Sequence, residues 1–302
     1  MLKSVAKKAK WARARRQLTA YTFIMPNLAG VLLFTLIPVA FSLVISFSSW
    51  DYVTPISEIR FTGLANYAKM WGDQWFLASL RNNLLYAFTT VPAAMALALA
   101  FAYIVDRFCR GKPVIRLLLY STNIVSSVVA AYAWQMMLSQ KGLVHSMLRA
   151  AGVTGAPHFL GDTRWAIWAL IALAVWSNLG YIFVLYMAGL QNVPADIYDA
   201  CLVDGCNELA RFFRVTVPML APTTFFIFIT QVIFSFRVFT PVQLLTQGGP
   251  GTSTSMLAYY AYISAFRYYE MGYSAAITWV LFIVIFAFTL AQWKLQDRWA
   301  LY

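Results

Sequence analysis

Charged residues are scarce in this sequence. Asp, Glu, Lys and Arg make up only 11% of its 302 residues, and 61% are apolar, whereas soluble domains carry roughly 25% charged residues. Acids are the scarcer sign, because 11 Asp and Glu stand against 23 Lys and Arg and leave a net charge of +12. This composition excludes an ordinary soluble domain and is typical of an integral membrane protein.

The sequence also lacks the residues of common catalytic and nucleotide-binding sites. Its single Gly-Lys pair, Gly111-Lys112, is followed by Pro113 where a phosphate-binding loop needs Ser or Thr. The two histidines, His145 and His158, have no metal-ligand spacing, and no nucleophile, base and orienting group can be placed together. We therefore expect no catalytic residue, no metal, no cofactor and no ATP hydrolysis on this chain.

Cysteine is sparse and odd in number. Cys109, Cys201 and Cys206 are the three cysteines, and all fall in segments that the charge pattern assigns to the cytoplasm. A reducing compartment disfavours disulfides, so none is predicted. Cys201 and Cys206 have no His or second cysteine pair nearby, which also disfavours zinc, and we interpret them as small, partly buried side chains.

Long charge-free runs are abundant. A helix needs about 20 residues to cross a hydrocarbon core of about 30 Å. Six runs are long enough, each bounded by a charged residue: 17–50, 82–105, 117–140, 165–195, 215–236 and 271–293. They predict an all-α membrane protein with six transmembrane helices. A seventh run, 238–266, contains "TQGGPGTSTS", which suits a turn, so we expect an external loop there.

Basic residues predict the orientation of the spans. The tail 1–16 carries seven Lys and Arg and no acid, which assigns it to the cytoplasm, and six spans then place both termini there. The chain divides into this basic tail and a transmembrane domain, 17–302. The first apolar run is too long for a cleaved signal peptide. More than half of the net charge lies in the tail, so topology explains it and no nucleic-acid partner is expected.

An ion gradient is one possible energy source. Ion-coupled carriers usually place acids or paired charges within their spans, and the six runs contain no acid. Unwound backbone carbonyls can bind sodium without acids, so an ion-coupled secondary solute carrier remains the alternative function. A membrane enzyme also remains open.

One polar segment, "YDACLVDGCNELARFFRVTVPMLAP" at 198–222, interrupts the apolar pattern. Pro194 suits a helix start, Gly205 a left-handed helix stop, and Asn207 the cap of a second helix. The pattern predicts a cytoplasmic helix, glycine turn and helix at about 194–218.

Both helices of this segment carry apolar residues at helical spacing. Tyr198 with Leu202, and Leu209 with Phe212 and Phe213, would each form an apolar stripe. Such stripes could lie on the membrane surface or enter a groove on a soluble partner. Spacing alone leaves both interpretations open.

The polar segment resembles the EAA loop of binding-protein-dependent ABC importer permeases, whose sugar-importer form runs Tyr-Glu-Ala-Ala, two residues, Asp-Gly-Ala, then Phe, Ile-Thr-Leu-Pro and a final Pro. The matching positions are Tyr198, Ala200, Asp204, Gly205, Phe212, Thr216, Pro218 and Pro222. Asp199 stands where the family usually has Glu, and Cys201 and Cys206 replace alanines. The small side chains and the retained charge keep the docking role, but Asp199 reaches less far than Glu.

Further segments resemble the carbohydrate-uptake branch, the group similar to the maltose and glycerol-phosphate permeases. They are "PNLAGVLLFTLIPVAFSLVISFSSWD", "WSNLGYIFVLYMAGLQNVPADIYDA", "LTQGGPGTSTSMLAYYAYISAF" and "MGYSAA". Their order along the chain matches as well as their residues.

The resemblance implies the permease subunit of an ATP-driven ABC importer for a sugar, oligosaccharide or related polyol, in a bacterial or archaeal cytoplasmic (inner) membrane. Its implied partners are a second homologous permease, which supplies the other half of the pathway, a cytoplasmic ABC ATPase dimer that binds Mg-ATP, and an extracytoplasmic solute-binding protein. The ATPase would contact the coupling loop through Tyr198, Asp199, Ala200, Asp204, Gly205 and Phe212.

Polar and aromatic residues within the spans are candidates for the substrate pathway: Gln135, Asn178, Tyr181, Gln231 and Arg237. Amides satisfy sugar hydroxyls, and aromatic faces cover sugar C–H surfaces. Each could instead make an interhelical hydrogen bond. Arg237 could extend to the membrane interface or contact an anionic group such as a phosphate or uronate. The sequence does not identify the substrate.

Overall fold

The chain folds almost entirely into helices. The computed structural model describes residues 19, 21–153 and 155–299, with side chains as far as Lys294. The basic tail predicted at 1–16 lies outside the described residues. The described helical elements are η1 (Leu32–Leu36), α2 (Ile37–Ser46), η2 (Ile56–Glu58), α3 (Ala65–Gly72), α4 (Gln74–Phe108), α5 (Lys112–Ile124), α6 (Ser127–Leu138), α7 (Leu143–Ala150), α8 (Ala166–Gln191), α9 (Ala195–Val203), α10 (Glu208–Arg211), η3 (Phe212–Thr216), α11 (Val217–Met219), α12 (Ala221–Phe236), η4 (Val242–Thr246), α13 (Leu257–Phe266) and α14 (Met271–Trp299).

Two short strands connect α2 to α3. β1 (Ser48–Ser49) pairs antiparallel with β2 (Arg60–Phe61), and Ser48 lies opposite Phe61 in the register. The amide of Asn66 donates to the carbonyls of Ser46 and Ser48, both at 2.9 Å. These bonds fasten the end of α2 to α3.

Four helices are long and apolar enough to cross a membrane: Tyr21–Ser46, Gln74–Phe108, Ala166–Gln191 and Met271–Lys294. Two bent pairs, Lys112–Ile124 with Ser127–Ala150 and Glu208–Met219 with Ala221–Phe236, raise the number to six if each is one span. The six predicted apolar runs fall on these helices, so the helical membrane fold is confirmed. By length and composition, the described helices provide four to six candidate crossings.

The third and fifth predicted spans are not continuous helices. The helix axis turns by 92° between α5 and the segment Ser127–Ala150, which contains α6 and α7, and by 67° between the segment Glu208–Met219, which ends with α11, and α12. The second bend lies between Pro218 and Pro222, and Pro222 removes the hydrogen bond that would join it to the residue four positions earlier. At the first bend, Val125 and Ser126 adopt extended backbone angles between the two helices.

The segment predicted as an external loop at 238–266 is only partly a loop. Residues 247–256 form turns, as expected, but α13 follows and buries most of its side chains. The hydroxyls of Tyr260 and Tyr273 donate to Asp73 Oδ2 at 2.5 and 2.6 Å, while Asp73 Oδ1 caps the start of α4. This carboxylate joins α13 and α14 to α4. The prediction was wrong for α13. The turn residues led us to assign the whole run to a loop, although the apolar residues that follow them form a helix.

Helices α4, α8, α12 and α14 share one hydrophobic core, which includes Ala98, Ile182, Ile227 and Ile277 with no exposed surface. Within it, α8 passes so close to α5 that a Cβ on Gly180 would lie 2.1 Å from the carbonyl oxygen of Leu119. Only glycine permits that approach. The core therefore fixes α4, α5 and α8 relative to one another.

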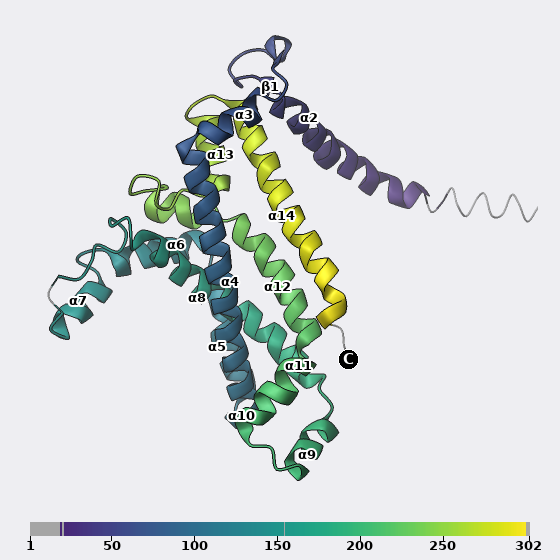
Figure 1. Cartoon of the computed structure of the whole chain (residues 1–302), viewed down its shortest axis with the longest axis vertical. Coiled ribbons are helices and arrows are strands. Elements are labelled where there is room, and N and C mark those ends of the chain that lie inside the picture. The colour runs from purple at the N-terminus through teal and green to yellow at the C-terminus, as the bar shows by residue number, and fades with distance from the viewer. Residues whose placement is uncertain (1–18, 20, 154, 300–302) are drawn as a thin grey trace, which may run out of the picture.

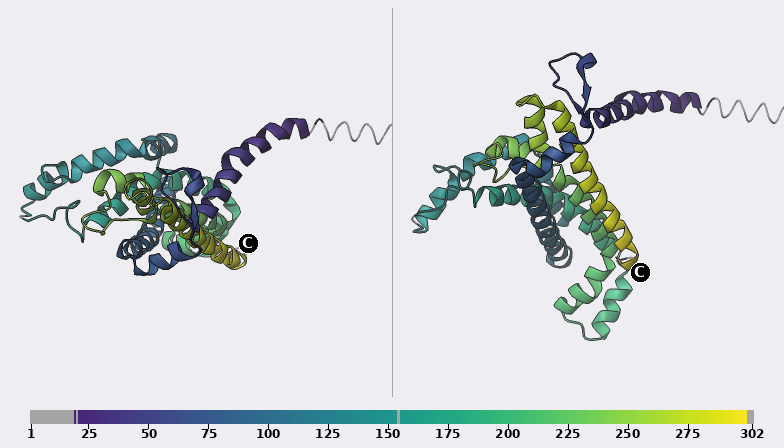
Figure 2. Two further views of the ribbon diagram at one scale, coloured as in Figure 1. Left: turned by 90° about the horizontal axis from the view of Figure 1, so that it is seen from above. Right: turned by 45° about the horizontal axis from the view of Figure 1, so that its top comes forward.

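The elements at the two ends of the helical body differ. In Figure 1, α3, β1 and α13 lie at the upper end, and α9, α10 and the end of α14 lie at the lower end. α2 projects sideways from the body (Figure 1). Both views in Figure 2 also show α2 pointing away from the other helices. Only 6% of the most apolar 18-residue stretch of the helix Tyr21–Ser46, which ends with α2, is buried. Pro92 interrupts α4 within its 35 residues, where it removes one backbone hydrogen bond.

Candidate functional site

The predicted coupling loop forms α9, a glycine turn and α10 at the lower end of the molecule (Figure 1). Gly205 has a φ of +75° at the turn, a backbone conformation that favours glycine. Asn207 Oδ1 accepts a hydrogen bond of 2.7 Å from the amide of Ala210 and caps α10. The helix, turn and helix expected from the sequence are confirmed.

Four of the six predicted ATPase-contacting residues lie at the surface of this loop. Asp199, Ala200, Asp204 and Gly205 are exposed, whereas Tyr198 and Phe212 are half-buried. The same loop also exposes large apolar side chains: Leu202, Val203, Leu209 and Phe213. Val203, which the sequence analysis did not single out, is 88% exposed. An exposed apolar group beside acids is the composition expected of a docking surface.

The two predicted apolar stripes each divide between surface and interior. Tyr198 lies beneath the guanidinium of Arg211, which is 5.6 Å from its ring centroid, and its hydroxyl lies 3.3 Å from Thr216 Oγ1. The ring of Phe212 meets that of Tyr103 edge to face at 4.8 Å. Tyr198 and Phe212 therefore hold the loop together, and their neighbours face outward.

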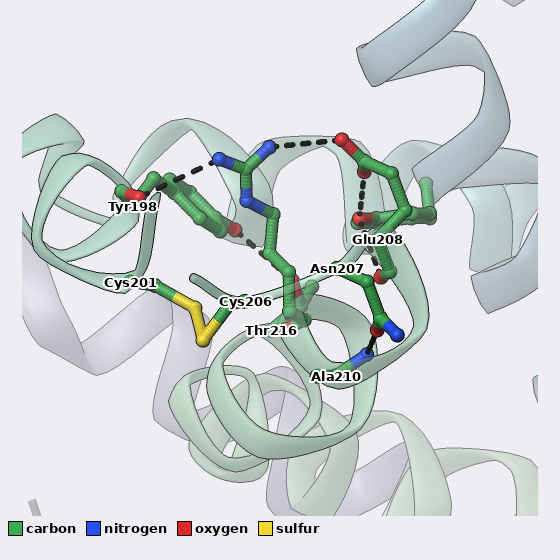
Figure 3. The surroundings of a disulfide bond; sticks show 9 residues. Tyr198, Cys201, Cys206, Asn207, Glu208, Ala210 and Thr216 are labelled. Atoms are coloured by element: carbon green, nitrogen blue, oxygen red, sulfur yellow. Dashed lines mark hydrogen bonds and ion pairs between the residues drawn. A yellow bond between two sulfur atoms is a disulfide. The ribbon is translucent and has the colours of Figure 1, made fainter. Parts of the chain in front are cut away.

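A disulfide between Cys201 and Cys206 closes the turn, as Figure 3 shows. The prediction that these cysteines stay unpaired was therefore wrong for the structure. The chain reverses at Gly205, the amide of Cys206 donates to the carbonyl of Cys201 at 2.9 Å, and the two Cα atoms lie 5.4 Å apart. The reducing cytoplasm was the basis for predicting unpaired cysteines, and it gives no information about this local geometry. Cys109 is a free cysteine.

A charged cluster joins the coupling loop to α4. Glu208 Oε1 lies 3.2 Å from Arg107 Nη2 on α4 and 3.2 Å from Arg211 Nη1. The hydroxyl of Tyr103, also on α4, donates to Glu208 Oε2 at 2.9 Å. Arg211 is only 2% exposed and reaches the carbonyl of Tyr198 at 3.5 Å. These contacts form a continuous connection from α9 through α10 to α4.

The cluster keeps Glu208 ionised. The hydrogen bond from Tyr103 is the largest cause of a lowered pKa for Glu208, and the hydrogen bond and charge of Arg107 and the charge of Arg211 also lower this pKa. The interaction is therefore complete above the ordinary pKa of a glutamate and is lost only as the pH falls through the lowered pKa. Sequence spacing gives no signal for this pairing, because Arg107 and Glu208 are 101 positions apart in the chain.

A cavity of about 470 Å³ lies between α4, α5, α6, α8 and α12. Three of the predicted pathway residues line it: Asn178, Tyr181 and Gln231. The other two do not. Gln135 lines a separate pocket, and Arg237 is an exposed residue at the end of α12.

The cavity is lined by nine polar and seven apolar residues, none of which carries a charge. Its polar residues are Tyr86, Thr90, Asn123, Ser127, Ser177, Asn178, Tyr181, Gln231 and Ser235. Gln231 Nε2 and Thr90 Oγ1 are buried and have no hydrogen-bond partner, and each residue is 4% exposed. Buried polar groups are normally satisfied, so these two atoms are unsatisfied polar groups on residues that line the cavity. A Thr within a helix usually bonds its own backbone, which is why Thr90 gave no signal in the sequence.

Acidic, histidine and cysteine side chains do not gather into a possible metal site. No group of three or more of them occurs in the described part of the chain. The site therefore consists of two parts, a surface loop linked to α4 and an uncharged cavity beside the middle of α4.

Comparison with known proteins relates this arrangement to a transport family. Residues 75–300 match the family model described as "Binding-protein-dependent transport system inner membrane component". The "Probable ABC transporter permease protein YesP" of Bacillus subtilis (strain 168) is 34% identical, over 94% of this chain and 92% of that protein. The "Trehalose/maltose transport system permease protein MalF" of Thermococcus litoralis is 31% identical, over 96% and 97%.

A solved structure has the same fold. The crystal structure of a bacterial ABC transporter involved in the import of the acidic polysaccharide alginate includes a chain with a TM-score of 0.83 and 19% identity, covering 95% of this chain and 98% of that one. The membrane helices, the family match and the relatives agree, and the chain belongs to the binding-protein-dependent ABC transporter permeases.

Proposed function

We propose that this chain is the permease subunit of an ATP-driven importer for a neutral carbohydrate, in a bacterial or archaeal cytoplasmic membrane. The exposed group on the coupling loop carries this proposal. Leu202, Val203, Leu209 and Phe213 are exposed beside Asp199 and Asp204. A partner that buries the apolar side chains and contacts the acids at the rim accounts for this combination.

The partner at the coupling loop is an ABC ATPase dimer. The ATPase would bind Mg-ATP, and this chain supplies the docking loop. Closure of the ATPase would displace α9, and the contacts of Arg211 and Glu208 would pass that displacement to Arg107 at the end of α4. Since α4 also contributes Tyr86 and Thr90 to the cavity, the same helix connects both parts of the site.

The substrate class follows from the lining of the cavity. A solute carboxylate or phosphate entering it would lose hydration without meeting a cationic side chain. Hydroxyl groups would instead meet the amides of Asn178 and Gln231 and the hydroxyl of Thr90. The relative from Thermococcus litoralis is named for trehalose and maltose, which supports carbohydrate as the substrate.

The remaining parts of the importer lie on other chains. A second homologous permease would complete the pathway against this cavity and cover the projecting helix at α2, together with lipid. An extracytoplasmic binding protein would deliver the sugar, as the family description supports. The coupling loop, both termini and the tail 1–16 would face the cytoplasm.

Gly205→Pro tests the docking role. At a φ of +75° proline cannot be accommodated, and the variant also loses the bond from the Gly205 amide to Leu202 O. Gly152→Pro is the matched control, because Gly152 has a φ of +82° and donates to Arg149 O, but lies in the segment after α7.

The tagged chain is purified from its native membrane in mild detergent, and the soluble proteins bound to it are identified. We expect a P-loop ATPase with the wild type and with Gly152→Pro, and its loss with Gly205→Pro. Absence of an ATPase from an intact membrane complex would contradict the proposal. Uptake that survives ATP depletion but stops with an ionophore would support the ion-coupled carrier in its place.

A further inference from the structure

The turn of the coupling loop contains a pair of cysteines that a disulfide joins (Figure 3). We propose that Cys201 and Cys206 are a thiol–disulfide exchange site that sets how firmly the ATPase docks. This inference rests on the proposed function, because it assumes that the loop faces the cytoplasm and contacts the ATPase. The reacting partner is a small thiol or disulfide of the glutathione class.

The backbone holds the two cysteines in position for exchange. The amide of Cys206 donates to Cys201 O at 2.9 Å, and the amide of Gly205 donates to Leu202 O at 3.0 Å. Their Cα atoms lie 5.4 Å apart, within the range that a disulfide requires. Because main-chain bonds maintain this approach, the pair can open and close without refolding the loop.

The ring closed by the disulfide contains part of the docking surface. Asp204 and Gly205 lie between the two cysteines and are exposed, as are Leu202 and Val203. The disulfide fixes the geometry of these residues before the partner arrives. In the dithiol form the turn keeps more freedom, and docking has to restrict it.

The compartment makes a permanent disulfide unexpected at this position. Disulfides in the cytoplasm are rare, and those that form are usually transient or redox-sensing. A pair held at bonding distance in a cytoplasmic docking loop is therefore expected to alternate between its two states. Cys109 is the third cysteine and is free, so it is replaced before the pair is labelled.

The exchange is a balanced two-electron reaction. Cys206 is half-exposed and Cys201 is 6% exposed, so the Cys206 thiolate attacks one sulfur of a small disulfide first. A mixed disulfide forms at Cys206 and one small thiolate leaves. The Cys201 thiolate then attacks the Cys206 sulfur, the protein disulfide forms, and the second small thiolate leaves. The two cysteines lose two electrons, and their two protons end on the two released thiols.

The state of the pair can be measured in the assembled transporter. Membranes containing the full complex are equilibrated in buffers of reduced and oxidised glutathione, quenched with acid, and treated with a maleimide that adds mass to each free thiol. In a Cys109→Ser background we expect two labelled cysteines under reducing conditions and none under oxidising conditions. A pair that stays in one state across all of these buffers would overturn the proposal.

The effect on docking is measured with the same membranes. The ATPase retained by the solubilised complex is titrated by dilution in the oxidised and reduced states. Oxidation should tighten retention about threefold to tenfold, whereas Cys206→Ser and Cys201→Ala should retain the ATPase equally in both buffers. Equal retention in both states of the wild type, or an unchanged redox response in the two variants, would overturn the inference.

Failure of the proposed function would look different. If neither state retains an ATPase, the docking role fails, although the labelling still reports whether the pair exchanges. If the ATPase is retained but redox state has no effect, the permease assignment stands and this inference fails.

Discussion

The coupling loop and the cavity depart from ordinary protein surfaces and interiors in opposite ways. The loop exposes apolar side chains such as Val203 and Leu209, and the cavity buries uncharged polar atoms of Gln231 and Thr90 without partners. In the proposed function, a protein partner would cover the exposed apolar side chains and a hydroxylated solute would contact the buried polar atoms. The proposed function therefore assigns energy input and solute recognition to separate regions, both of which include residues of α4.

Gln231→Leu should have the largest effect, and it should affect the cavity without affecting the coupling loop. Because its Nε2 has no partner in the protein, its loss should remove a hydrogen bond to the solute and reduce sugar uptake about tenfold. ATPase retention should not change. Uptake is measured in membrane vesicles with the labelled neutral sugar that the wild type transports best.

Gln292→Leu is the matched control for this variant. Gln292 is 6% exposed and also has an unpartnered side-chain atom, but it lies beside a separate apolar pocket. Its uptake should stay near the wild-type rate. Equal losses in both variants would indicate general damage to the membrane domain.

Glu208→Arg would break the connection between the regions. The new cation would face Arg107 and Arg211, so ATP hydrolysis stimulated by loaded binding protein should fall about threefold, the scale expected of partly exposed ion pairs. Asp106→Arg is the control, since Asp106 pairs with Lys112 at the same end of α4 without contacting the loop. The connection has no coupling role if both variants lower stimulated hydrolysis equally.

Arg237→Ala should have the smallest effect. Arg237 lies outside the cavity lining and is exposed, so we expect uptake within about twofold of the wild type, as for most surface substitutions. The loss should be equal for neutral and anionic solutes in competition assays. A selective loss of anionic uptake would mean that solute passes Arg237 and that the uncharged cavity is not the only recognition surface.

Local sequence patterns predicted the coupling loop well. Pro194, Gly205 and Asn207 act on residues a few positions away, so the helix, turn and helix follow from their order. The disulfide was missed even though its two cysteines are only five positions apart. The cysteines were predicted to stay unpaired because the cytoplasm is reducing. The left-handed turn expected at Gly205 could instead have indicated that the two side chains approach each other.

The cavity was harder to predict because it is assembled from five helices. Asn178, Tyr181 and Gln231 were found by their polarity within apolar runs, whereas Gln135 has the same polarity and lies elsewhere. Helix rotation decides which polar residues share a cavity, and six nearly uniform apolar runs give no signal for that rotation. The breaks at Val125 and Pro222 turn two of these runs and change which faces meet.

Helix α4 can be regarded as a lever of about 50 Å, fastened near one end through Asp73 and at the other through Arg107. Pro92 removes one backbone hydrogen bond within this helix, next to Thr90 and Val91 in the wall of the cavity. A push on the Arg107 end of this lever should bend it at Pro92 before it moves the Asp73 end. Motion of the proposed ATPase would therefore change the shape of the cavity.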